Sequence, residues 1–147
     1  MAGIVGAVAV LDQLTKSAAL QFLPGRAVQL TDWLQFALHF NSGAAFSMGQ
    51  SMTGVFTAIQ LAFVLGVAWY ARKVRDWWTA TGLALIAGGA LGNVVDRLVR
   101  APGFFVGHVV DFISVRGFAV FNLADSAITI GVAVFIIAVF LEERRAK

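Results

Sequence analysis

Long apolar stretches without charged residues constrain this chain more than any other feature. Residues 77–95 are nineteen consecutive positions without Asp, Glu, Lys or Arg, and residues 33–71 contain none either. A helix needs about 20 mainly apolar residues to cross the hydrocarbon core of a bilayer. Of the 147 residues, 59% are hydrophobic and 13% are charged, whereas soluble domains have about 25% charged residues. The sequence therefore predicts an integral membrane protein.

Four segments have the length and composition of membrane-spanning helices. The first lacks the basic start and the small-residue cleavage site of a signal peptide, so we interpret it as a span. Four spans leave no room for a second domain, and we expect one membrane domain over residues 1–147. The spans are expected at about 1–23, 52–71, 77–97 and 121–141.

The segment 28–50 has a different pattern. From Leu34 to Asn41 large apolar residues alternate along the chain, which is the period of a strand. We expect a short β element at the membrane surface here, and an outer loop over residues 98–120. The strand-like alternation places four large side chains on one face: Leu34, Phe36, Leu38 and Phe40.

The distribution of basic residues predicts an orientation. The loop at residues 72–75 and the C-terminal tail each hold three Lys or Arg residues, against four on the other side of the predicted spans. Cytoplasmic loops are enriched in Lys and Arg, so we expect both termini in the cytoplasm. The unusual polar residues then gather at the outer face: Asp12, Lys16, Asn41, Asn93, Asp96, Arg97, Asp111, Asn122 and Asp125.

Composition excludes several classes of chemistry. The chain has no cysteine, which excludes disulfides, thiolate metal sites and cysteine nucleophiles. Only His39 and His108 could contribute imidazole, so a multi-histidine metal centre is not expected. The net charge of +3 comes mostly from short clusters beside the spans and indicates topology, not nucleic-acid binding. We therefore expect no metal, no cofactor and no nucleic-acid partner.

Asp111 and Asp125 are the best candidates for a reactive pair. Both lie in strongly apolar surroundings, and an ionisable residue in a membrane protein is a functional-site hypothesis. Two close carboxyls share one proton, which provides an acid and a base in a single site. Spacing alone leaves other interpretations open, in which Asp125 caps a helix and Asp111 is a turn residue between strands.

Two other functions also remain open from the residues alone. Lys16 could serve as the base of a serine–lysine peptidase with Ser47 or Ser126 as nucleophile. A small proton-coupled transporter could use Asp12, Asp111 and Asp125, although transporters place such groups near the bilayer midplane. Asp12 and Lys16 are four residues apart and could also be a self-neutralised helix pair.

Five sequence blocks in order carry a more specific signal. Together they resemble the bacterial lipoprotein signal peptidases, also called signal peptidase II. The blocks are Asp12-Gln13-Leu14-Thr15-Lys16, Asn41-Ser42-Gly43-Ala44-Ala45-Phe46-Ser47, the segment 88–97 (GGALGNVVDR), Val109-Val110-Asp111-Phe112 and Phe121-Asn122-Leu123-Ala124-Asp125.

The resemblance implies an aspartic endopeptidase of the bacterial inner membrane, with four transmembrane helices and a small periplasmic β cradle. Such enzymes remove the signal peptide from prolipoproteins, cleaving before a cysteine that carries a diacylglyceryl group, and are inhibited by globomycin. Asp111 and Asp125 match the catalytic dyad of the family. Its supporting residues correspond here to Asp12, Lys16, Asn41, Gly89, Asn93, Arg97 and Asn122.

Overall fold

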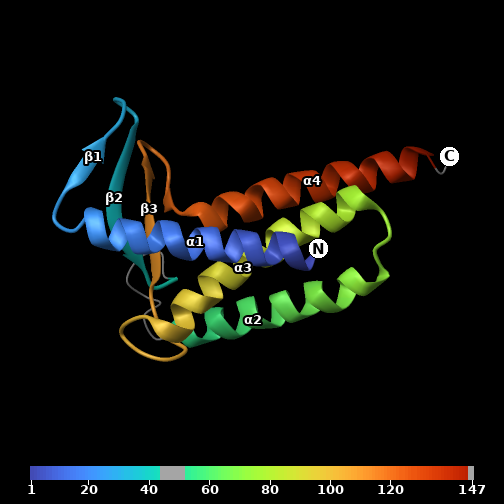
Figure 1. Cartoon of the computed structure of the whole chain (residues 1–147), viewed down its shortest axis with the longest axis horizontal. Coiled ribbons are helices and arrows are strands. Elements are labelled where there is room, and N and C mark those ends of the chain that lie inside the picture. Colours follow the sequence, from blue (N-terminus) through green and yellow to red (C-terminus); the bar gives the residue numbers. More distant parts are fainter. Residues whose placement is uncertain (44–51, 146–147) are drawn as a thin grey trace.

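The computed structural model describes residues 1–43 and 52–145. Four long helices lie side by side, and a small sheet stands at one end of them (Figure 1). Each of these helices is long and apolar enough to cross a membrane, so the expected fold class is confirmed. The helices are α1 (Ala2–Phe22), α2 (Thr53–Tyr70), α3 (Trp77–Val99) and α4 (Leu123–Arg145), with a short 3-10 helix, η2 (Ala71–Lys73), after α2.

The sheet is antiparallel and has the strand order β1-β2-β3-β4. The third strand and the first residue of the fourth lie inside the segment 98–120, where a loop was expected, so that expectation is wrong for these residues. Phe121 was expected at the start of the fourth span and is instead the second residue of the fourth strand. Residues 44–50 of the expected β element lie outside the described residues. The strands are β1 (Ala27–Gln29), β2 (Leu34–Asn41), β3 (Val109–Val115) and β4 (Val120–Phe121).

A register shift divides β2 into two halves. Phe36 pairs with Ile113, and His39 pairs with Asp111. Between these two pairs β2 advances by three residues and β3 by only two. Such a bulge changes which side chains share a face. Phe40 pairs with Val110 and is therefore on the opposite face from Phe36. The prediction that Leu34, Phe36, Leu38 and Phe40 share one face is wrong. The shift instead places Asn41 on the face of β3 that carries Asp111.

α3 is the central helix. Of the 18 residues in its most apolar stretch 72% are buried, against 11–22% for the corresponding stretches of the other three helices. α3 also contacts all three of these helices. Glycines make these contacts close. A Cβ at Gly89 would collide with the carbonyl oxygen of Ala124 in α4, and a Cβ at Gly92 would lie 2.5 Å from Asp12 Oδ2 in α1. The role of Gly89 in this structure is thus to let α4 approach α3.

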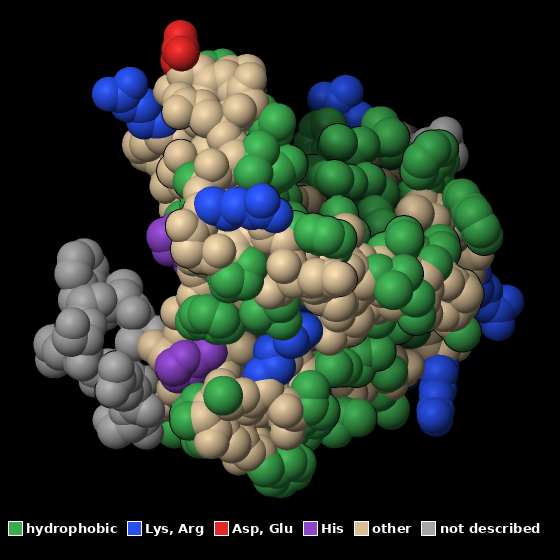
Figure 2. Space-filling model, turned by 60° about the vertical axis from the view of Figure 1, so that its left-hand side comes forward, with side chains coloured by type: hydrophobic (Ala, Val, Ile, Leu, Met, Phe, Trp, Pro, Cys, Tyr) green, Lys and Arg blue, Asp and Glu red, His purple; other side chains and the backbone are tan. Residues whose placement is uncertain are grey.

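The outer surface of the helices is apolar. Figure 2 shows hydrophobic side chains over much of the helical body and only scattered charged groups. Large side chains such as Leu65, Trp69 and Ile136 are exposed on it. A soluble protein would bury such groups, whereas the hydrocarbon of a bilayer accommodates them.

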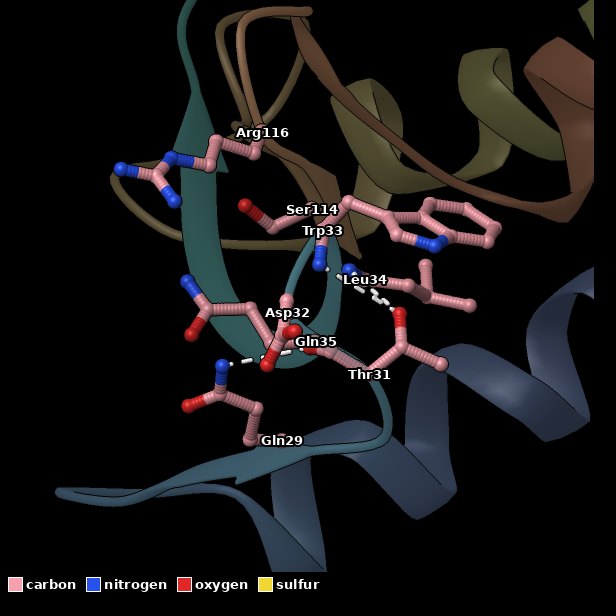
Figure 3. A pocket seen from close by; sticks show the side chains of 8 residues that line it. All are labelled: Gln29, Thr31, Asp32, Trp33, Leu34, Gln35, Ser114 and Arg116. Carbon is pink, nitrogen blue, oxygen red and sulfur yellow. Dashed lines mark hydrogen bonds between the residues drawn. The ribbon is translucent and has the colours of Figure 1, made fainter.

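A polar pocket of about 290 Å³ lies at the turn between β1 and β2 (Figure 3). The hydrogen bonds that its side chains make are local. Gln29 Nε2 donates to the carbonyl of Thr31, and Thr31 Oγ1 accepts from the amides of Trp33 and Leu34. The pocket is lined by Gln29, Thr31, Asp32, Trp33, Leu34, Gln35, Ser114 and Arg116.

Candidate active site

α4 begins with a reciprocal cap made by Asn122 and Asp125. The amide of Asp125 donates to Asn122 Oδ1 at 2.9 Å, and the amide of Asn122 donates to Asp125 Oδ2 at 3.2 Å. This capping box satisfies two N–H groups that a helix start leaves unpaired. The other carboxyl oxygen, Asp125 Oδ1, accepts from Asn93 Nδ2 at 2.9 Å. Asp125 therefore caps its helix and also faces α3.

Asp111 comes from β3 and is only 2% exposed. It is a strand residue, not the turn residue that one interpretation expected. Both oxygens of its carboxyl accept hydrogen bonds, from Asn41 Nδ2 at 3.0 Å and from Asn122 Nδ2 at 2.7 Å. The register shift in β2 is what brings Asn41 alongside.

Asn122 holds the two aspartates together. Its side chain contacts Asp111 while its backbone and Oδ1 contact Asp125. The same Nδ2 also lies 3.2 Å from Asn93 Oδ1 and 3.3 Å from the carbonyl of Val110. Asn122 is completely buried, so these contacts replace hydrogen bonds to water that the site cannot make. One residue thereby fixes the ends of β3, α3 and α4 relative to each other.

The electrostatics favour a protonated carboxyl in this pair. Burial raises the pKa of Asp111 to about 6, opposed by the hydrogen bond from Asn41 and reinforced by the negative charge of Asp125. Two carboxyls whose charges repel each other in this way cannot both ionise cheaply. The arrangement can therefore hold a neutral acid beside a carboxylate.

Asp125 borders an open apolar pocket of about 380 Å³. The side chain is only half-buried, unlike that of Asp111. A ligand with an apolar segment could therefore lie against α4 and meet Asp125. The other lining residues are Phe118, Phe121, Ser126, Thr129 and Ile130.

Residues 4–141 match the family model described as signal peptidase (SPase) II. The chain belongs to the signal peptidase II family. It is 43% identical to a lipoprotein signal peptidase of Mycobacterium leprae, over 91% of this chain and 68% of that protein. The identity is 47% to one of Rhodococcus jostii, over 91% and 69% of the two chains. The chain thus spans about two thirds of the length of these relatives.

Solved structures agree with this membership of the signal peptidase II family. A bacterial membrane enzyme determined by the in meso method at 2.3 Å resolution superposes with a TM-score of 0.80 at 28% identity, covering 98% of this chain and 89% of the other. A second, at 1.9 Å resolution, has a TM-score of 0.78 at 30% identity and covers 92% and 89%. The chain is therefore a multi-pass membrane peptidase.

The nine residues that match functional positions of signal peptidase II are not all in contact with one another. Seven are joined by hydrogen bonds or ion pairs into a single cluster, which ends at Lys16 and Asp12. Gly89 lies at the contact between α3 and α4. The joined residues are Asp12, Lys16, Asn41, Asn93, Asp111, Asn122 and Asp125.

Among the described residues, Arg97 has no hydrogen bond or ion pair to this cluster. In the part of the chain that the structure describes, the ion pairs of the neighbouring Asp96 are with Lys16 and Arg100, not with Arg97. Its guanidinium is buried and donates to Gln60 Oε1 at 3.1 Å, and to the carbonyls of Ser42 and Gly107. It therefore connects α2, the end of β2 and the segment before β3.

The sequence did not predict the contacts that three residues of the site region make in this signal peptidase II chain. Asp96 is fully buried and binds Lys16, Arg100, Gln13 and the amide of Val110. Its position four residues before Arg100 gave a signal for that pair alone. Nothing in the sequence pattern indicated that Gln13 or Gln60 would reach α3.

Proposed function

We propose that this chain is an aspartic endopeptidase that removes the signal peptide from diacylglyceryl-modified prolipoproteins, cleaving before the lipidated cysteine. The observation that carries the proposal is the Asn122 bridge, which joins Asp111 to Asp125, and Asp125 lies at the edge of an apolar pocket. The name of the relatives, lipoprotein signal peptidase, supports the substrate class. Membrane lipid surrounds the helices and presents the substrate.

In this mechanism Asp125 is the base and Asp111 is the acid. The half-buried Asp125 carboxylate takes a proton from water as the water oxygen attacks the scissile carbonyl carbon. Asp111 is buried and its pKa is raised to about 6, and in its protonated form it donates its proton to the carbonyl oxygen. The tetrahedral diol then collapses, a proton passes from the dyad to the leaving amine nitrogen, and the C–N bond breaks. No metal or nucleophilic side chain is needed.

The orientation belongs to the same proposal. With both termini in the cytoplasm, the sheet and the dyad lie at the outer, extracytoplasmic face of the bacterial inner membrane. Both termini of the chain lie away from the sheet end in Figure 1, which is consistent with this arrangement. The apolar pocket beside Asp125 would then open toward the outer leaflet, where the acyl chains of a lipidated substrate lie. Globomycin is expected to compete there.

The alternatives have less support. A serine–lysine peptidase needs a lysine amine in reach of a serine, but Lys16 is held by Asp12, Asp96 and Asn93. Ser126 donates to the carbonyl of Asn122, and Ser47 lies outside the described residues. A transporter would require its carboxyls near the midplane, whereas Asp111 stands in the sheet at one end of the helices.

The test is cleavage of a purified diacylglyceryl prolipoprotein by the purified protein in detergent or vesicles. We expect parental cleavage to resist chelators and to be inhibited by globomycin, and Asp111→Asn and Asp125→Asn to lose it. Full activity in either variant would disprove the dyad. Loss of parental activity with a chelator would disprove the metal-free mechanism.

A further inference from the structure

The buried Lys16 joins polar side chains of α1 and α3. Lys16 Nζ is 2.7 Å from Asp12 Oδ2, 2.9 Å from Asp96 Oδ2 and 2.8 Å from Asn93 Oδ1. An ammonium has three donors, so these three acceptors match its full capacity. Lys16, Asp12 and Asp96 are all completely buried. The charge of Lys16 is therefore committed to joining α1 to α3.

The two carboxylates that Lys16 joins each reach a further element. Asp12 Oδ1 accepts from the amide of Ala124 at 2.9 Å, and Asp96 Oδ2 accepts from the amide of Val110 at 3.1 Å. Ala124 directly precedes Asp125, and Val110 directly precedes Asp111. Each structural aspartate thus holds the residue before one member of the dyad.

Val110 is held from both sides. Its amide donates to Asp96, while its carbonyl accepts from Asn122 Nδ2 at 3.3 Å. These contacts fix the peptide units on either side of Val110, the second of which leads into Asp111. Asp96 therefore fixes the backbone of β3 next to Asp111.

Stability alone does not account for this cluster. Taking two carboxylates and an ammonium out of water is costly, and well-packed apolar residues often replace such buried ion pairs without loss of stability. Arg100 contributes the second positive charge through Asp96 Oδ1 at 2.6 Å, so the cluster is neutral but still expensive to bury. Asp12 and Asp96 also accept hydrogen bonds from two backbone amides. These bonds fix the orientation of the peptide units, which apolar residues cannot do.

We propose that Asp96 is a positioning residue for the reaction, and that the bridge Asp12–Lys16–Asp96 sets the separation between the carboxyls of Asp111 and Asp125. This inference rests on the proposed function. Asp12 fixes the position of Asp125 through the amide of Ala124, and Asp96 fixes that of Asp111 through the amide of Val110. Lys16 fixes the distance between Asp12 and Asp96. A shift of about 1 Å in a reacting group lowers turnover by about 10²-fold.

The test compares Asp96→Asn with Asp96→Glu, because the two variants keep different properties. Asparagine keeps an oxygen in place to accept from the Val110 amide but loses the charge. Glutamate keeps the charge but moves the carboxylate by one methylene. If Asp96 positions Asp111, the kcat per folded enzyme falls by about 10²-fold in Asp96→Glu and less in Asp96→Asn. KM for the lipidated prolipoprotein stays near the parental value in both.

The matched control is Asp76→Ala at the other end of α3. Asp76 caps that end by accepting from the amide of Thr79 at 2.7 Å. Its loss should lower Tm and leave kcat unchanged. The positioning proposal is overturned if Asp96→Glu keeps parental kcat, or if kcat in both Asp96 variants only follows Tm. Full activity of Asp111→Asn would instead overturn the proposed function itself.

Discussion

Two polar clusters lie at the sheet end of this molecule, and they are built in different ways. The pocket at the β1–β2 turn has an acid, a base, two amides and hydroxyls (Figure 3), but its side-chain hydrogen bonds join residues two or three positions apart. The cluster around Asn122 has similar groups, yet its bonds join residues such as Asn41 with Asp111 and Asp12 with Ala124.

Burial follows the same division. Asp32 is exposed at the turn, whereas Asp111 is 2% exposed. A side chain in water loses little when a partner is removed, while a buried polar group left without its partner costs the full desolvation penalty. Polar composition therefore does not distinguish the two clusters, but buried contacts between remote segments do. Matched substitutions in the two clusters test this difference.

The largest difference is expected in activity. Asp111→Asn removes the acid of the dyad and should lower kcat by about 10²–10⁴-fold, the usual contribution of a general acid or base. Asp32→Asn makes the same chemical change in the exposed pocket and should leave kcat within twofold of the parent, which is about the precision of the assay. Prolipoprotein cleavage at saturating substrate measures both. Equal losses in the two variants would contradict the comparison.

The next difference is in stability. Lys16→Met leaves the carboxylates of Asp12 and Asp96 without their shared cation, and removal of one partner from a buried ion pair costs about 3–5 kcal/mol. Arg116→Met at the exposed pocket should change the free energy of unfolding by less than about 0.5 kcal/mol. Denaturant unfolding in detergent measures both. Comparable values would show that burial does not separate the clusters.

The two clusters also contain carboxamides that can be compared. Asn122→Ala removes a helix cap, for which about 0.5–2 kcal/mol is typical, and also removes the link between β3 and α4. We expect a loss of stability of at least this size together with a lower kcat. Gln35→Ala should have neither effect, because its side chain is at the exposed pocket. Thermal unfolding and cleavage rates provide the two measurements.

The smallest effect is expected in pH dependence. Asn41 donates to Asp111 Oδ2 and stabilises its anion, so Asn41→Ala should raise the pKa of Asp111 further above about 6. Activity that needs a neutral Asp111 is lost as pH rises through this pKa. The alkaline limb of kcat/KM should therefore move to higher pH, by up to about one unit. A limb that moves to lower pH would contradict this assignment.

The same pKa has a consequence for folding. Asp111 keeps its proton up to a pH of about 6 in the folded chain, whereas an exposed aspartate releases it near pH 3.8. The folded state then binds more protons in this interval, so stability falls as pH rises through it. Unfolding measured between pH 4 and pH 7 should show this slope in the parent and not in Asp111→Asn.

The sequence predicted the parts of this structure that depend on local pattern. Four apolar helices follow from composition and length, and the pairing of Asp12 with Lys16 follows from their spacing of four residues. The motif blocks selected Asp111 and Asn122, which the structure joins.

Other parts depend on contacts that no local pattern contains. The strand β3 was taken for a loop, because its short apolar run lies between turn signals and shows no alternation. The bulge in β2 was missed because the alternation of apolar residues continues through it. The pairing of Asp96 with Lys16 could not be predicted, since the approach of α1 to α3 is set by Gly92, eighty residues from Asp12.

The pair of Asp12 and Lys16 also bears on how the protein is made. α1 is synthesised before α3 and α4, and its ammonium and carboxylate neutralise each other within one helix turn as it enters the lipid. Asp96 follows with the third helix, and Ala124 and Asp125 follow with the last. The bridge can reach the residues beside both Asp111 and Asp125 only when α4 has been inserted. A nascent chain therefore has no assembled site until α4 is in place.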